Sequence, residues 1–260
     1  MPTRPYSATV TAGDDILATQ YNNLRSDAFY NFNLVWEQGA SHDQYSENGF
    51  NGDSNYVYFV RSTRIIYRLA IWPQGLFFSP SGTANLYFVS LAGTYTTIAK
   101  GIAIIGQYGY VWATDGSYKL VRIDLTNGNV TNMTISGTAP DNDSSNVVTM
   151  DGTDLYILDD GTTTLRKYSI SGTTATYVTA ITLSEAASTA VLVDSANSVI
   201  YFRANASANI VKNNMSGTLI RKDQALLATG ATTFMGYVGN IAYIKYRSVS
   251  AITFFHPLYY

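Results

Sequence analysis

From about residue 101 onward, the sequence repeats itself with a period close to 45 residues. The clearest matches at an offset of 45 are Ile102 with Val147, Tyr110 with Leu155, Val147 with Leu192, and Lys167 with Lys212. A last copy follows 42 positions later, where Leu192-Val193 matches Phe234-Met235 and Ile200-Tyr201 matches Ala242-Tyr243. Four units in a consistent order indicate a fold that is built from one repeated structural element.

Each unit contains four short segments with the composition of β-strands. A short apolar segment, such as 147–150, comes first, and a second segment rich in aromatic residues, such as 110–114, follows a tight turn. The third segment ends in a hairpin-turn signal such as Asn127-Gly128, and a Thr-rich fourth segment such as 174–183 completes the unit. Four antiparallel strands in about 40 to 45 residues are typical of a β-propeller blade. The sequence therefore predicts an all-β chain that forms a β-propeller.

The length of the repetitive region, residues 31–260, corresponds to about five blades of this size. Residues 45–100 are less regular, because two segments, 76–78 and 86–90, compete for the place of the fourth strand. One blade with an insertion there gives five blades, which we favour, and two compact blades give six. A β-sandwich or a solenoid is the alternative architecture.

The last unit ends after its third strand, which we place at 252–259, so its fourth strand must come from elsewhere. The segment 31–37 lies before the first blade and has strand character. If it supplies the missing strand, the ring closes and two exposed sheet edges disappear. We therefore expect two parts, an N-terminal segment over 1–30 and a propeller over 31–260 that is closed by a strand near 31–37.

The segment 1–30 contains the only convincing helix pattern. Asp14 is a suitable N-cap, and apolar side chains then follow at spacings of 4, 3 and 4, at Leu17, Tyr21, Leu24 and Ala28. A helix of about 15 residues is marginal in water by itself. The short amphipathic helix is therefore expected to dock on its own domain, on a copy of itself or on a partner.

Composition excludes several classes of function. Lys and Arg number 16 against 18 Asp and Glu, which leaves a net charge of -2, so the charge pattern of a nucleic-acid-binding protein is absent. The chain has no cysteine, which rules out disulfides, thiolate metal sites and a cysteine nucleophile. No apolar stretch is long enough for a membrane span. The sequence predicts no cofactor.

The search for catalytic residues gives no motif. The two histidines, His42 and His256, lie near opposite ends of the chain and form no recognisable pair. A glycosidase, the enzymatic alternative, would need two carboxylates about 5 to 9.5 Å apart. The candidates are Asp151, Asp159, Asp160 and Asp194. Each of them adjoins an apparent turn, where Asp is a default residue, so the sequence favours a protein that is not an enzyme.

Two further features have two interpretations each. The loop 141–146 could hold calcium through its side-chain oxygens, but it lacks the Gly and the distal Glu of an EF-hand, which favours a solvated connection between blades. The tyrosines near turns, Tyr108, Tyr118, Tyr259 and Tyr260, suit a sugar-binding surface or a protein interface.

The N-terminal segment Thr11-Ala-Gly-Asp-x-Ile-Leu-Ala-x-x-Tyr-Asn-Asn-Leu-Arg-x-Asp-Ala28 resembles a segment near the start of many tailed-bacteriophage structural proteins. These proteins are tail-fibre-like or head-decoration-like, and diverse β-rich domains follow the segment. The resemblance covers about 20 of the 260 residues. It implies an attachment element whose docking residues are Ile16, Leu17, Tyr21, Asn22, Leu24 and Arg25.

We therefore expect a non-enzymatic structural protein of a virion or of the extracellular space. The N-terminal helix would attach it to other virion or filament subunits, and the propeller would be displayed. A homo-oligomer is expected, because most oligomers are symmetric assemblies of identical copies. One rival is a lectin-like propeller that binds a cell-surface glycan or receptor. Another is a self-polymerising filament subunit, in which residues 5–11 add a strand to the next subunit.

Overall fold

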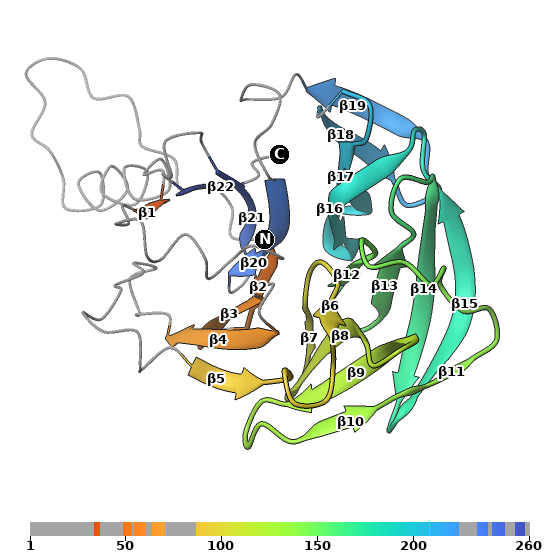
Figure 1. Cartoon of the computed structure of the whole chain (residues 1–260). Helices are drawn as coiled ribbons and strands as arrows, with labels where there is room; N and C mark the ends of the chain where they lie inside the picture. The colour runs from red at the N-terminus through yellow and green to blue at the C-terminus, as the bar shows by residue number, and fades with distance from the viewer. Residues whose placement is uncertain are drawn as a thin grey trace, which may run out of the picture.

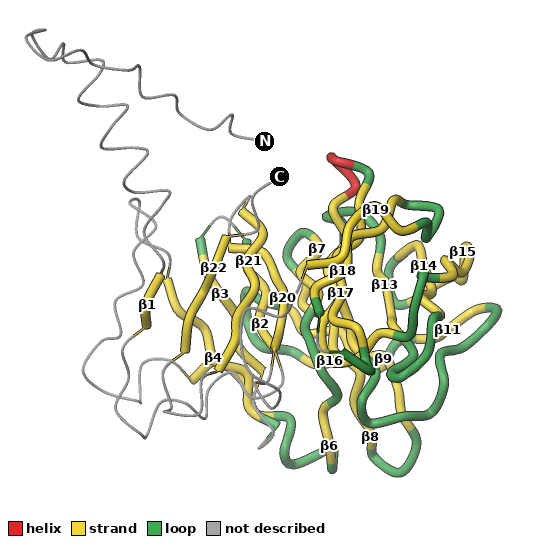
Figure 2. Tube along the Cα trace, turned by 90° about the horizontal axis from the view of Figure 1, so that it is seen from above, coloured by secondary structure: helices red, strands yellow, loops and turns green. Residues whose placement is uncertain are grey.

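A computed structural model describes residues 34–36, 49–53, 55–60, 64–70, 87–207, 209–223, 233–238, 241–247 and 253–257. Within these residues the chain is all-β, apart from one 3₁₀ turn, η3 (Ser195–Asn197), which lies at one end of the strands (Figure 2). No helix in this part of the chain is long and apolar enough to cross a membrane. The helix predicted between residues 14 and 28 lies outside the described residues.

The strands form five sheets, which we number I to V (Figure 1). Sheet I contains β2 (Gly49–Gly52), β3 (Tyr56–Val60), β4 (Ile65–Ala70) and β5 (Tyr87–Ser90). Sheet II contains β6 (Thr97–Ile98), β7 (Ala103–Ile105), β8 (Tyr108–Thr114), β9 (Tyr118–Asp124) and β10 (Val130–Asn132). Sheet III contains β11 (Thr134–Ser136), β12 (Val147–Met150), β13 (Leu155–Leu158), β14 (Thr164–Ser171) and β15 (Thr174–Thr182).

Sheet IV contains β16 (Ala187–Asp194), β17 (Val199–Ala204), β18 (Ile210–Asn214) and β19 (Leu219–Asp223). Sheets I to IV are thus made of strands that are consecutive in the chain. Sheet V differs from the other sheets in the origin of one strand. It contains β20 (Thr233–Val238), β21 (Ile241–Arg247) and β22 (Thr253–Pro257). Its fourth strand is β1 (Leu34–Trp36), which comes from the N-terminal part of the chain and pairs antiparallel with β22.

The sheets are arranged around a common centre (Figure 1). Their innermost strands contact one another in the order β2, β7, β12, β16 and β20, and β20 contacts β2 again. Antiparallel sheets that radiate from an axis, with the first strand of each nearest the centre, are the arrangement of a β-propeller. The prediction of an all-β propeller is therefore confirmed.

A tyrosine occupies the same register position on the second strand of every sheet. The first-strand, second-strand and third-strand partners are Asn51–Tyr58–Arg68, Ala103–Tyr110–Arg122, Thr149–Tyr156–Lys167, Leu192–Tyr201–Lys212 and Gly236–Tyr243–Pro257. In sheets III and IV the lysine nitrogen lies over the tyrosine ring, at 5.6 and 5.5 Å from its centroid. Attraction between a cation and a ring therefore accompanies the repeat in these two sheets.

This register corrects one detail of the predicted repeat. Leu192 corresponds to Thr149 rather than to Val147. Thr149 pairs with Tyr156 and Leu192 pairs with Tyr201, and these two tyrosines occupy the same register position in their sheets. The offset between sheets III and IV is therefore 43 in the first strand and 45 in the second and third. The cause is the length of the hairpin ladder: one residue pair lies between the Thr149–Tyr156 pair and its turn, and two lie between the Leu192–Tyr201 pair and its turn.

Apolar side chains fill the spaces between neighbouring sheets. One cluster joins sheets I and II around Tyr58, Ile66 and Val111, and the next joins sheets II and III around Trp112 and Leu155. Further clusters join sheets III and IV and sheets IV and V. Full burial of one such aliphatic or aromatic side chain contributes about 1.5–3 kcal/mol, so these inter-sheet layers are the main source of stability.

Sheets V and I approach each other very closely at the centre. A Cβ atom on Gly236 of β20 would overlap the carbonyl oxygen of Phe50 on β2, so only glycine fits there. Next to this contact, the backbone N–H of Tyr237 donates to Oδ1 of the buried Asn51 side chain at 2.9 Å. Side-chain and backbone contacts thus link the first strand of sheet V to that of sheet I.

Candidate functional site

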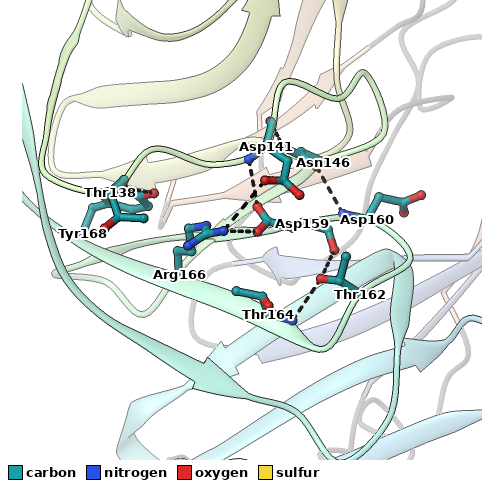
Figure 3. A network of polar contacts seen from close by, with 9 residues as sticks. All are labelled: Thr138, Asp141, Asn146, Asp159, Asp160, Thr162, Thr164, Arg166 and Tyr168. Carbon is teal, nitrogen blue, oxygen red and sulfur yellow. Dashed lines mark hydrogen bonds and ion pairs between the residues drawn. The ribbon is translucent and has the colours of Figure 1, made fainter.

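A network of polar contacts lies where the turn between β13 and β14 meets the connection over residues 137–146 (Figure 3). Its centre is the ion pair between Asp159 Oδ2 and Arg166 Nη2, 2.7 Å apart. The side chain of Asp159 is buried, at 1% exposure, and its Oδ1 accepts a bond from the backbone N–H of Asp141 at 3.3 Å. The carboxylate therefore links the β13–β14 hairpin to the connection between β11 and β12.

Burial determines the direction of the pKa shift of Asp159, whereas the pKa of Arg166 is raised by Asp159 against the effect of its own burial. Desolvation raises the pKa of Asp159, although Arg166 and the N–H of Asp141 favour the ionised form and pull it in the opposite direction. Beside it, the hydroxyl of Tyr168 donates to the carbonyl oxygen of Thr138 at 3.0 Å, and burial raises the pKa of this phenol. The neutral phenol of Tyr168 and the ion-paired carboxylate of Asp159 have structural roles here, because each is engaged in a contact within the protein.

The connection over 141–146 is held by the protein itself. The fully buried side chain of Asn146 donates from Nδ2 to the carbonyl oxygen of Asp141 at 2.7 Å and accepts from the N–H of Asp160 at 3.1 Å. Asp143 accepts from the N–H of Ser145 at 2.7 Å. These bonds fix the loop, which connects β11 to β12 of sheet III. Within the described residues, no group of three or more His, Asp or Glu side chains is placed to hold a metal ion.

Asp160 links three sheets. Its Oδ1 lies 3.5 Å from Nζ of Lys100, which precedes β7 of sheet II, and accepts from the N–H of Thr189 on β16 of sheet IV at 3.2 Å. Asp160 itself belongs to the β13–β14 turn of sheet III. Asp159 and Asp160 are neighbours in sequence, but their carboxylates contact different partners.

The other two carboxylates flagged in the sequence cap turns after first strands. Asp151 Oδ1 accepts from the N–H groups of Thr153 and Asp154, at 3.0 and 2.8 Å, and its Oδ2 accepts from the Tyr156 hydroxyl at 2.9 Å. Asp194 accepts from the N–H and from Nδ2 of Asn197, at 3.1 and 2.7 Å. Local hydrogen bonds of this kind are the reason Asp is common in turns.

Asp53 is a third member of this set that the sequence analysis missed. Its Oδ1 accepts from the N–H groups of Asn55 and Tyr56, both at 2.7 Å, directly after β2. An Asp that caps the turn between the first and second strands therefore recurs in sheets I, III and IV. The signal was present in the sequence, but it could be found only after residues 49–52 were identified as a first strand.

The turn tyrosines that are described pack against their own sheet. Tyr118 stacks on Trp112 with ring centroids 6.1 Å apart, and its N–H donates to Oδ1 of Asn142 at 2.9 Å. Arg122 lies over the ring of Tyr108, 4.4 Å from its centroid. His256 lies on β22 opposite Ile244.

The remaining sequence candidates lie outside the described residues. They are His42, Tyr259, Tyr260 and the predicted docking residues Ile16, Leu17, Tyr21, Asn22, Leu24, Arg25 and Ala28. The site that the structure brings together therefore consists of inter-blade polar contacts, and the predicted attachment element is separate from it in sequence.

Comparison with known proteins supports the fold. No protein-family model and no curated protein sequence matches this chain. Among solved structures, a chain of a nidogen/laminin complex is similar, with a TM-score of 0.52, 14% identity, and coverage of 75% of this chain and 90% of that chain. Glutaminyl cyclase of Myxococcus xanthus is similar with a TM-score of 0.53, 12% identity, and coverage of 84% and 93%. At these identities the similarity shows the fold alone.

Proposed function

We propose that the five sheets are the five blades of a closed propeller. The shared tyrosine position in all five sheets supports this blade count, and so does the succession of contacts from β2 through β20 back to β2. The pairing of β1 with β22 would give sheet V its fourth strand from the N-terminal part of the chain. Closure by a distant strand would cover the edge of β22 and tie both ends of the propeller together.

We propose that this propeller is a non-enzymatic structural protein of a virion or of another extracellular assembly. The observation that supports a non-enzymatic role is that the four candidate carboxylates are engaged in structural contacts. Asp151 and Asp194 cap turns, and Asp159 and Asp160 hold neighbouring sheets together. Groups that are engaged in this way give a rigid body suited to display.

The attachment would come from residues 1–30. The apolar stripe of Leu17, Tyr21, Leu24 and Ala28 and the resemblance to N-terminal segments of tailed-bacteriophage structural proteins support a docking helix. Burial of this stripe on a neighbouring subunit would stabilise a helix that is marginal alone. The propeller would then be the exposed part, available for assembly or for contact with a host surface.

The test uses the full chain with Leu17→Asp and Leu24→Asp together. Charges in the stripe should abolish incorporation into the native assembly, measured by electron microscopy and by co-sedimentation with it. The thermal unfolding midpoint should stay nearly unchanged, because the stripe does not form part of the propeller core under this proposal.

A matched control carries the same charges on the polar face of the helix, as Thr19→Asp and Ser26→Asp. This variant should be incorporated normally. Two results would contradict the proposal: unfolding of the whole protein by the stripe substitutions, which would make the helix part of the core, or normal incorporation of the stripe variant.

A further inference from the structure

Thr189 on the innermost strand of sheet IV has an unusual backbone conformation. Its φ angle is 64°, in the left-handed region, although its side chain is branched at Cβ. Such residues are rarely found there because the branched side chain crowds the backbone. A strained residue persists only where the surrounding structure holds it in place, and such residues concentrate in segments that switch or clamp.

The strain coincides with an irregularity of β16. Ala187 pairs with Ala204 and Val191 pairs with Phe202, so the three residues from Ser188 to Ala190 lie opposite the single residue Arg203. The Thr189 hydroxyl is buried and has no hydrogen-bond partner among the described residues. The threonine side chain therefore adds no polar contact that would offset the strain of its backbone.

Contacts from neighbouring sheets hold this bulge. The N–H of Thr189 donates to Oδ1 of Asp160 at 3.2 Å, and Lys100 lies 3.5 Å from the same oxygen. Just before the bulge, the N–H of Gly161 donates to the carbonyl oxygen of Ala187 at 2.8 Å. One carboxylate thus receives a backbone N–H from sheet IV and a cation from sheet II.

We propose that Asp160 is a latch that keeps the segment Ser188–Ala190 of β16 in a strained conformation. When the latch is intact, the first strand of sheet IV is fixed to sheets II and III. When the carboxylate is lost or competed for, the strained segment opens locally while the rest of the sheet stays folded. The latch is accessible to such competition, because the side chains of Lys100 and Asp160 are 23% and 21% exposed.

Amide hydrogen exchange in the full chain tests this latch. In Asp160→Ala, the amides over 188–190 should exchange at least about tenfold faster than in the unaltered protein, since a hydrogen bond to a charged acceptor is lost. Amides of β17 and β18 should keep their rates. Thr189→Gly removes the strain, so adding Asp160→Ala to that variant should accelerate exchange by less than about threefold.

Asp154→Ala is the matched control. Asp154 forms an equally exposed ion pair with Lys167, at 2.7 Å, but the pair lies within sheet III. This variant should leave exchange over 188–190 unchanged. The proposal is overturned if Asp160→Ala has no effect on this segment, if it accelerates exchange uniformly across sheets III and IV, or if its effect is undiminished in the Thr189→Gly background.

Discussion

At the scale of single residues, the carboxylates of this chain act on its own backbone and cations. Asp53, Asp151 and Asp194 accept N–H bonds from the residues that follow them, which fixes the turn between the first and second strands. Asp159 is different, because it is buried and its partner is the guanidinium of Arg166. A buried ion pair stabilises a protein less than its short distance suggests, since both charges lose their hydration.

The raised pKa of Asp159 predicts how stability depends on pH. A carboxyl group whose pKa is higher in the folded state binds its proton more tightly there, so its contribution favours the folded protein at low pH. This contribution to stability is lost as pH rises through the pKa of the folded state. The stability difference therefore changes between the ordinary aspartate pKa of about 3.9 and the higher pKa of the folded state.

Asp159→Asn removes this titration with little change of shape. The free energy of unfolding of the unaltered protein, relative to that of Asp159→Asn, should therefore increase as pH falls from neutral into this window. Urea titrations of both proteins at several pH values would measure the difference. A difference that decreases on acidification would show that Arg166 outweighs desolvation and that the pKa of Asp159 is lowered.

At the scale of elements, β20 and β2 pack closely against each other at Gly236. Gly236→Ala places a methyl group against the Phe50 carbonyl, a backbone atom that cannot move away alone. Overpacking of this kind costs about 1–3 kcal/mol, so the variant should lower the free energy of unfolding by that amount. Gly93→Ala is the control, because a Cβ at Gly93 meets no atom within 4 Å and should leave stability nearly unchanged. Equal denaturation midpoints for the two variants would contradict the close contact.

The order of strands within each unit could be predicted from sequence, because apolar, aromatic and Thr-rich segments alternate with Gly-containing turns. The exact register could not. The β16–β17 hairpin has one more residue pair before its turn than the β12–β13 hairpin, and this shifts the match of Leu192 without leaving a compositional signal. The parallel pairing of β11 with β15 was also missed, because residues 129–136 read as one Thr-rich fourth strand, whereas β10 pairs with β9 and β11 pairs with β15 of the next sheet.

At the scale of the whole molecule, the propeller was predictable from its period, and the turn roles of Asp151 and Asp194 followed from their position after apolar strands. The inter-sheet roles of Asp159 and Asp160 were not predictable. Both lie in an Asp-Asp-Gly turn that looks like a solvent-exposed turn in sequence, yet Arg166, Lys100 and Thr189 reach this turn from three sheets. Contacts between sheets depend on the ring geometry, which a single sequence does not contain.

The closed ring can be tested directly with one engineered disulfide. Val35 and Phe254 are partners in the β1–β22 pairing, and directly opposed residues of antiparallel strands have Cα separations that suit a disulfide. The chain has no native cysteine, so Val35→Cys with Phe254→Cys can form only this intramolecular bond. A second protein with Val35→Cys and Val130→Cys is the control, because Val130 lies on β10 of sheet II.

Mild oxidation of the folded monomer, followed by mass spectrometry, would measure the cross-link. Our account predicts nearly complete bonding between positions 35 and 254, with a higher thermal unfolding midpoint, and none between positions 35 and 130. Failure of the first pair to bond in folded protein, or equal bonding of both pairs, would contradict closure of the propeller by β1.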